Sequence, residues 1–179
     1  MMNHNTHDTQ WQRWEVFKQD TPQKPHQAVG SVHAGDPEHA LLTARNVFAR
    51  RPLAVSMWVA PADRILSRTL EEAEVLKPSQ HKSQEYVIFS KNSHKRAMTF
   101  VDYALSLEAN SPEEALQKAQ QELKDALVWW VVAKSDIYSS DEEDTESWFA
   151  PAKDKTYKQQ SAYGLIGNRV RKAKGEADD

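Results

Sequence analysis

The sequence predicts an α+β fold built from two tandem units, each with the element order strand, strand, helix, strand (ββαβ). Matching residues recur in the same order in both halves of the 179-residue chain. Each predicted helix begins at a capping residue followed by proline, and each leads into an apolar run typical of a buried strand. We expect the two units to form a pseudo-dimer with an extended C-terminal tail. Ferredoxin-like and β-grasp (ubiquitin-roll-like) strand arrangements both fit this order of elements.

The internal repeat divides the chain. The matched segments, with the offset between them, are Glu15–Lys18 with Val87–Ser90 (72), Ala44 with Ala119 (75), Trp58–Ala60 with Val131–Ala133 (73) and Asp63 with Asp136 (73). The offset changes between elements, where loops tolerate insertions. The predicted parts are a first repeat (11–66), a linker (67–84), a second repeat (85–140), and an acidic loop with an aromatic and basic C-terminal tail (141–179).

The first two strands of each unit are predicted by runs of β-branched and aromatic residues. They are Trp14–Lys18 and Gln27–Ala34 in the first unit, and Tyr86–Phe89 and Met98–Glu108 in the second. Polar, turn-prone segments at 20–25 and 91–96 lie between the strands of each pair. Each pair therefore predicts a hairpin whose loop is longer than two residues.

The helix starts are the clearest local signals. Ser111 is followed by Pro112 and then by Glu114, the pattern of a capping box. Asp36 and Pro37 form the corresponding start in the first unit, without the third-position glutamate. Apolar residues then recur at helical spacing, so one face of each helix should pack on a sheet.

Each helix leads into an apolar run that predicts the last strand of its unit, Leu53–Ala60 in the first and Leu127–Ala133 in the second. The second run has no polar alternation, so we expect both of its faces to be covered. It contains Trp129 and Trp130 in succession, which would point to opposite faces of the sheet.

Composition excludes several classes of function. The chain has no cysteine, so disulfides, thiolate zinc sites, Cys-ligated clusters and cysteine nucleophiles are excluded. The net charge of −3 gives no general attraction to nucleic acid, which we do not expect as a partner. No apolar run is long enough to span a membrane, and residues 1–10 lack the features of a secretory signal. We expect a cytoplasmic protein.

The sequence carries no recognisable active site. The spacings Glu-x-x-His and His-Glu-x-x-His and the glycine-rich phosphate loops are absent. His33 and His39 flank a strand-to-helix turn, but a metal would need further ligands from elsewhere, so we interpret both as structural. The prediction is that this chain has no catalytic residue, metal ligand or cofactor-binding residue of its own.

Four motifs of the first repeat resemble a known family. They are W-E-V-F at 14–17, V-G-S-x-H-A at 29–34, A-R-x-V-F-x-R-R at 44–51 and V-S-x-W-V at 55–59. In this order they resemble the B subunit of bacterial phenylacetyl-CoA 1,2-epoxidase, the PaaB family. The resemblance covers about residues 11–66. The family's usual chain is about one copy long, whereas this chain is doubled and extended.

The resemblance implies a non-catalytic subunit of a multicomponent di-iron oxygenase that epoxidises the ring of phenylacetyl-CoA. The implied partners are an A subunit with the di-iron centre and the acyl-CoA site, a C subunit, and a reductase whose NADPH, flavin and iron–sulfur chemistry stays outside this chain. The implied role is to bridge A–C pairs. The alternative from the residues alone is a stand-alone α+β ligand-binding or regulatory module.

The chain has more large aromatic residues than two small cores require, and such residues commonly anchor protein interfaces. The predicted partner interface is Trp11, Trp14, Trp58, Trp148, Phe149, Tyr157, Tyr163 and Arg169.

Overall fold

A computed structural model describes residues 10–49, 54–72, 83–143 and 145–153. In chain order the elements are β1 (Arg13–Gln19), β2 (Gln27–His33), α1 (Pro37–Phe48), β3 (Ser56–Pro61), η1 (Ala62–Arg64), β4 (Leu66–Thr69), β5 (Gln84–Lys91), β6 (Asp102–Ala109), α2 (Pro112–Glu122), β7 (Val128–Ala133), η3 (Lys134–Asp136), β8 (Tyr138–Ser139) and α3 (Thr145–Lys153). The ββαβ order therefore occurs twice, which confirms the α+β fold with a tandem repeat.

The predicted caps begin both main helices. The Asp36 side chain accepts a hydrogen bond from the His39 backbone N–H at 2.8 Å, and the Ser111 hydroxyl accepts one from the Glu114 N–H at 3.1 Å. The Glu114 carboxylate in turn accepts the N–H of Asn110, one residue before the cap. These bonds satisfy N–H groups that have no partner inside the helix, so each helix starts at its proline.

The strands form one antiparallel sheet in the order β4-β7-β5-β6-β2-β1-β3-β8. Within each repeat the first strand lies between the second and third, so β2-α1-β3 and β6-α2-β7 are split βαβ units of the ferredoxin-like kind. The order is symmetric, because reading it from either end meets equivalent strands of the two repeats.

The two repeats exchange their last short strands. β4, from the first repeat, pairs with β7 of the second, and β8 pairs with β3 of the first. The pairs Leu66 with Val131 and Tyr138 with Val59 are equivalent at an offset of 72 residues. Each repeat therefore completes the sheet of the other. Residues 67–69 of β4 belong to the segment that we expected to act as a linker.

A pseudo-two-fold axis passes between β2 and β6. Gln27 and Asp102, equivalent at an offset of 75, are paired across this seam. The N–H of Ala28 donates to the Val101 carbonyl at 2.8 Å, and the N–H of Tyr103 donates to the His26 carbonyl at 2.7 Å. These two bonds are equivalent under the same offset, so the repeats meet as the subunits of a symmetric dimer would.

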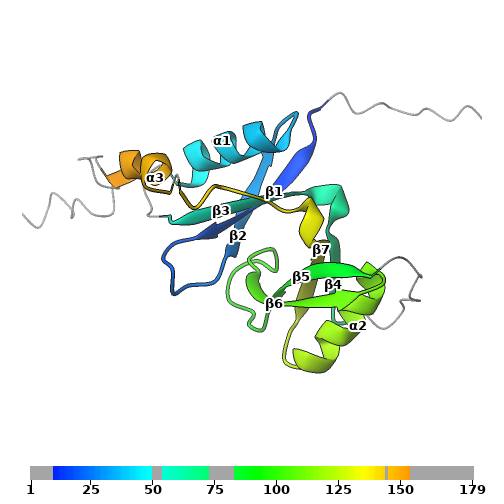
Figure 1. The fold of residues 1–179 in the computed structure, drawn as a ribbon. Coiled ribbons are helices and arrows are strands. Elements are labelled where there is room, and N and C mark those ends of the chain that lie inside the picture. The colour runs from blue at the N-terminus through cyan, green and yellow to red at the C-terminus, as the bar shows by residue number, and fades with distance from the viewer. Residues whose placement is uncertain (1–9, 50–53, 73–82, 144, 154–179) are drawn as a thin grey trace, which may run out of the picture.

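Three hydrophobic cores hold the chain together. One lies under α1 and one under α2, on the outer faces of the two halves of the sheet (Figure 1). The third lies between the halves and is centred on Phe17 and Phe89, whose rings stack at 4.0 Å. Trp129 belongs to the core under α2 and Trp130 to the central core. Every residue of β7 is buried, which confirms that both faces of this strand are covered.

The repeat alignment in the third strand was wrong by one residue. Phe17 pairs with Trp58 across β1 and β3, and Phe89 pairs with Trp130 across β5 and β7, so Trp58 is equivalent to Trp130 and not to Val131. The same shift separates Asp63 from Asp136, which are the second residue of η1 and the third of η3. An apolar run without alternation carries no register signal, and a one-residue slip exchanges the faces of the sheet.

The segment 141–179, expected as a loop and tail, contains α3, which lies beside α1 (Figure 1). Phe149 of α3 is buried in the core of the first repeat, and Trp148 packs against the same core. Residues 154–179 lie outside the described part of the chain.

Candidate functional site

The predicted interface residues lie in different environments. Trp11 is 60% exposed, and its ring meets the edge of the His39 ring at 5.3 Å. Trp58 is half-buried at the seam between the repeats, and half-buried Trp148 lies beneath the Arg45 guanidinium at 5.1 Å. Tyr157, Tyr163 and Arg169 lie outside the described residues.

Trp14 and Phe149 are buried inside the chain itself. Both belong to the core under α1, and the Trp14 indole N–H donates to the Ala34 carbonyl at 3.0 Å. Their burial leaves little surface for another protein, so contact with a partner would have to come from the exposed members of the set. The interface as a whole stays a prediction.

The motif glycine at position 30 has a packing role. Its φ is +144°, and a Cβ built there would lie 2.8 Å from the ring of Phe48, the aromatic residue of another motif. The equivalent residues of the second repeat, at an offset of 75, are Leu105 and Leu123, which pack on the core under α2. Glycine with phenylalanine in one repeat thus corresponds to two leucines in the other.

Replacing Gly30 by alanine is expected to lower the free energy of unfolding by about 2–3 kcal/mol, because it adds both a strained φ and a clash with Phe48. Urea denaturation measures the loss. The matched control is Gly35→Ala, since a Cβ at Gly35 meets no atom within 4 Å. Equal stability losses in the two variants would contradict this explanation.

The two histidines considered as metal ligands both contact Trp11. The Nδ1 atom of His33 lies 2.8 Å from the Trp11 carbonyl oxygen, and His39 meets its ring. Within the described ranges, no group of three or more His, Asp or Glu side chains is placed to hold a metal ion. Through Trp11, which lies just before β1, His33 holds the end of β2 and His39 holds the first turn of α1.

His26 lies in a mostly apolar setting beside the seam. Its ring stacks on Trp58 with centroids 3.5 Å apart, and its Nε2 lies 2.9 Å from the Ser56 hydroxyl. Burial lowers the pKa of His26 to about 4. The ring is consequently neutral in the folded protein at neutral pH.

This histidine predicts a specific loss of stability in acid. The unfolded chain protonates His26 below its ordinary pKa of 6.5, whereas the folded chain resists protonation down to about 4. The stability that His26 contributes is therefore complete above 6.5 and falls as the pH drops toward 4. We expect a loss of about 1–2 kcal/mol between about pH 7 and about pH 5 in urea denaturation. His26→Gln should remove this part of the pH dependence, and an unchanged dependence would contradict the assignment.

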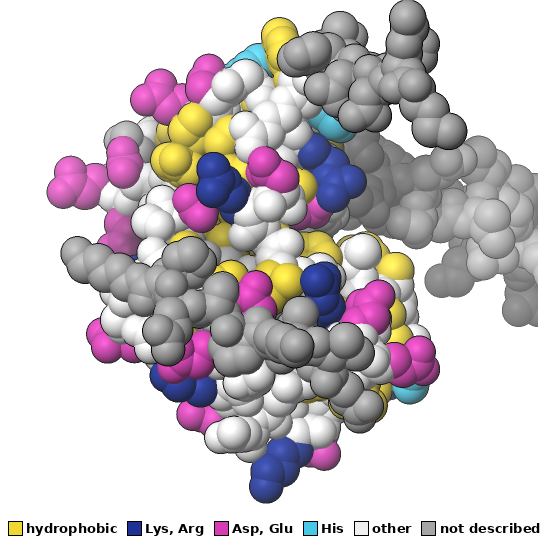
Figure 2. All heavy atoms as spheres, turned by 90° about the vertical axis from the view of Figure 1, so that its right-hand side faces the viewer, with side chains coloured by type: hydrophobic (Ala, Val, Ile, Leu, Met, Phe, Trp, Pro, Cys, Tyr) yellow, Lys and Arg dark blue, Asp and Glu magenta, His cyan; other side chains and the backbone are white. Residues whose placement is uncertain are grey.

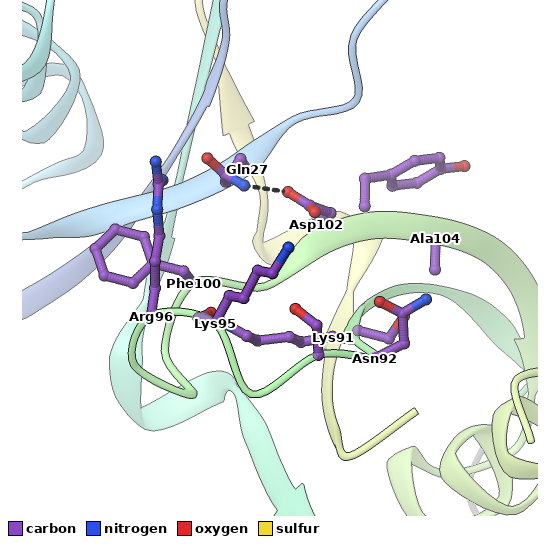
Figure 3. Close-up of a pocket in the computed structure, with 11 residues that line it drawn as sticks. Gln27, Lys91, Asn92, Lys95, Arg96, Phe100, Asp102 and Ala104 are labelled. Carbon is purple, nitrogen blue, oxygen red and sulfur yellow. Dashed lines mark hydrogen bonds between the residues drawn. The ribbon is translucent and has the colours of Figure 1, made fainter. Parts of the chain in front are cut away.

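A polar hollow of about 480 Å³ opens at the seam, between the start of β2 and the loop that joins β5 to β6 (Figure 3). Its lining includes Lys91, Lys95, Arg96 and, from the seam itself, Gln27 and Asp102. The sequence interpretation missed this cluster, because residues 91–96 were interpreted only as a turn. The available signal was the absence of any acidic residue from 91 to 101.

One face of the molecule carries side chains of mixed character. Figure 2 shows acidic and basic side chains scattered among small hydrophobic groups on the face it presents. Trp11, Leu42 and Val47 are among the exposed large hydrophobic residues. Among the described residues, none of the helices has the length and apolar composition that crossing a bilayer requires.

Comparison with known proteins gives a consistent result. The model of the family Phenylacetic acid degradation B (PaaB) matches the chain twice, over residues 10–86 and 82–170. The B subunit of the 1,2-phenylacetyl-CoA epoxidase of Escherichia coli (strain K12) is 35% identical over 80 residues, which cover 44% of this chain and 84% of that relative. No solved structure shows a match. The two family matches correspond to the two ββαβ repeats.

Proposed function

Because the chain belongs to the phenylacetic acid degradation B family, we propose that it is the B subunit of a phenylacetyl-CoA epoxidase and that it bridges two catalytic units. The relative that it resembles is itself a subunit of such an enzyme. In this proposal the chain serves phenylacetate catabolism by assembling other subunits, and it carries out no step of the oxidation itself.

The pseudo-two-fold symmetry is the observation that carries the bridging role. The equivalent outer helices α1 and α2 lie on opposite sides of the molecule (Figure 1). A symmetric body presents the same kind of surface twice, so it can hold two copies of one partner. Fusion of the repeats fixes both surfaces in one chain.

The proposed partners are those that the family resemblance implies: an A subunit with the di-iron centre, a C subunit, and the reductase as a further candidate. The di-iron, NADPH, flavin and iron–sulfur chemistry is placed in these partners. Exposed Trp11 and half-buried Trp148, both next to α1, are two described members of the predicted interface that offer surface on the first repeat.

Co-expression tests the proposal. An affinity-tagged copy of this chain is purified from cells that also produce the A and C subunits, and the same A and C subunits without the chain serve as the control. We expect A and C to be retained together, and ring epoxidation with added reductase to require the chain. Failure of the tagged chain to retain either partner, with binding of a metabolite by the chain alone, would favour the regulatory module instead.

A further inference from the structure

We propose that the hollow between β2 and the β5–β6 loop is an anion-binding site that receives carboxylate groups from an acidic segment of a partner subunit. The inference rests on the proposed function for the existence of that partner. Its other grounds are the charges that line the hollow, the burial of Lys91 and the contrast with the corresponding loop of the first repeat.

Three cations line the hollow without a counter-ion. Lys91, Lys95 and Arg96 form no ion pair with any carboxylate of the described chain. Asp102 is the acidic residue of the lining, and one of its oxygens accepts a hydrogen bond from the Gln27 amide at 2.6 Å. The lining therefore has an excess of two positive charges in a chain whose net charge is −3.

One of these cations is held inside the protein. Lys91 is only 8% exposed, and its ammonium donates hydrogen bonds to the carbonyls of Lys95 and Ala97, the latter at 2.9 Å. An ammonium has three N–H donors, so one remains for a ligand. Carbonyl dipoles compensate a buried charge less well than a carboxylate does, which makes an approaching anion favourable.

The corresponding loop of the first repeat shows the contrast. There Asp20 pairs with Lys18 at 2.9 Å and with Lys24 at 3.4 Å, and these contacts lower the pKa of the Asp20 carboxyl. The first loop thus supplies a carboxylate that pairs with both of these lysines. The second loop has no acidic residue with which to do so. The two loops therefore depart from the pseudo-symmetry in their charges, and the cations without a carboxylate partner lie in the loop of the second repeat.

The loop that joins β5 to β6 also holds its cationic side chains in position before a ligand binds. Arg96 has a φ of 65°, in the left-handed region that few non-glycine residues adopt, and its guanidinium lies 5.7 Å from the centre of the Phe100 ring. Figure 3 shows the side chains of Lys95 and Arg96 extending from the loop toward β2. A planar guanidinium and an ammonium in one lining can each pair with carboxylate oxygens.

The mixed chemistry of the lining favours an acidic peptide over phosphate. The second oxygen of Asp102 would repel a phosphate dianion, but it can accept a backbone N–H from a peptide whose side-chain carboxylates meet Lys95 and Arg96. Asn92 and Ser93 add further donors and acceptors to the lining. The hollow thus offers a peptide both cations and acceptors.

The test uses the full chain in complex with the A and C subunits. Lys95→Glu combined with Arg96→Glu should weaken binding to the A–C pair by about tenfold or more, and added salt should weaken binding of the unaltered chain. Arg64→Glu combined with Lys134→Glu makes the same change in net charge at two exposed positions, on η1 and η3, outside the hollow and both outer helices, and should change binding by less than about twofold. Circular dichroism checks that each variant folds.

Carbodiimide coupling identifies the occupant, because it joins a lysine amine directly to a carboxylate that touches it. We expect an amide bond between Lys95 and an Asp or Glu of a partner subunit, lost in Lys95→Arg although that variant still binds. Saturable binding of inorganic phosphate by the chain alone, without such a cross-link, would overturn the acidic-peptide assignment. Unchanged binding by the double-glutamate variant would overturn the site alone, whereas failure of the unaltered chain to bind A–C would overturn the proposed function.

Discussion

Replacing Phe89 by alanine is expected to lower the free energy of unfolding by about 4 kcal/mol. The side chain is fully buried in the core between the repeats, where it stacks on Phe17 at 4.0 Å and meets the edges of Trp58 and Tyr103. The substitution removes buried apolar area, leaves a cavity and abolishes the ring contacts. Urea denaturation followed by far-ultraviolet circular dichroism measures the loss.

Pseudo-symmetry supplies an internal control for this prediction. Phe17 is the equivalent of Phe89 and is also fully buried, so Phe17→Ala should cost a similar amount. Combining the two substitutions should cost less than the sum of both, because they share one ring contact. Leu42→Ala, at a position 44% exposed, should cost less than about 1 kcal/mol. A loss near that of Leu42→Ala for either phenylalanine would contradict a central core that joins the repeats.

Separating the repeats is expected to have the larger effect. Fragments 10–72 and 83–153 each lose the strand that the other provides, since β4 pairs with β7 and β8 with β3. Each fragment also exposes its half of the central core. Neither should fold as a monomer, because the apolar area left in water offsets what its remaining core buries.

Mixing the two fragments should restore the fold. We expect a one-to-one complex by analytical ultracentrifugation, with the circular dichroism spectrum of the intact chain. Phe89→Ala in the second fragment should weaken this association, which links the two predictions. A stable, folded monomer of residues 10–72 would show that the repeats are independent domains and would contradict the exchange of strands.

Local signals predicted the elements well. Ser111 and Asp36 marked the two helix starts because a cap, a proline and an apolar face are all encoded within a few residues. The covered faces of β7 followed from the unbroken apolar run at 127–133. The internal repeat predicted the tandem architecture before any contact between the halves was known.

Features that depend on contacts between distant residues were not predictable. β8 is only two residues long and is held by pairing with β3, so its sequence carries no strand pattern of its own. The one-residue shift between Trp58 and Val131 arose because an apolar run fits two registers equally well. Trp14 and Phe149 were placed in a partner interface because an aromatic residue that anchors a core and one that anchors an interface look the same in sequence.

The charged hollow could not be predicted from the sequence for a similar reason. Lys91 and Asp102 lie on opposite sides of a ten-residue loop, and their common lining follows from the closure of the β5–β6 hairpin against β2. In sequence, Lys95 and Arg96 look like the basic residues of any polar turn. Their significance depends on comparison with the loop of the first repeat, where Asp20 pairs with two lysines, and that comparison requires the symmetry of the fold.

Native mass spectrometry of the complex assembled with the A and C subunits tests the bridging role most directly. We expect each assembly to contain one copy of this 20.5 kDa chain together with two A and two C subunits. An assembly with a single A–C pair for each chain, at concentrations where A and C are in excess, would contradict the bridge.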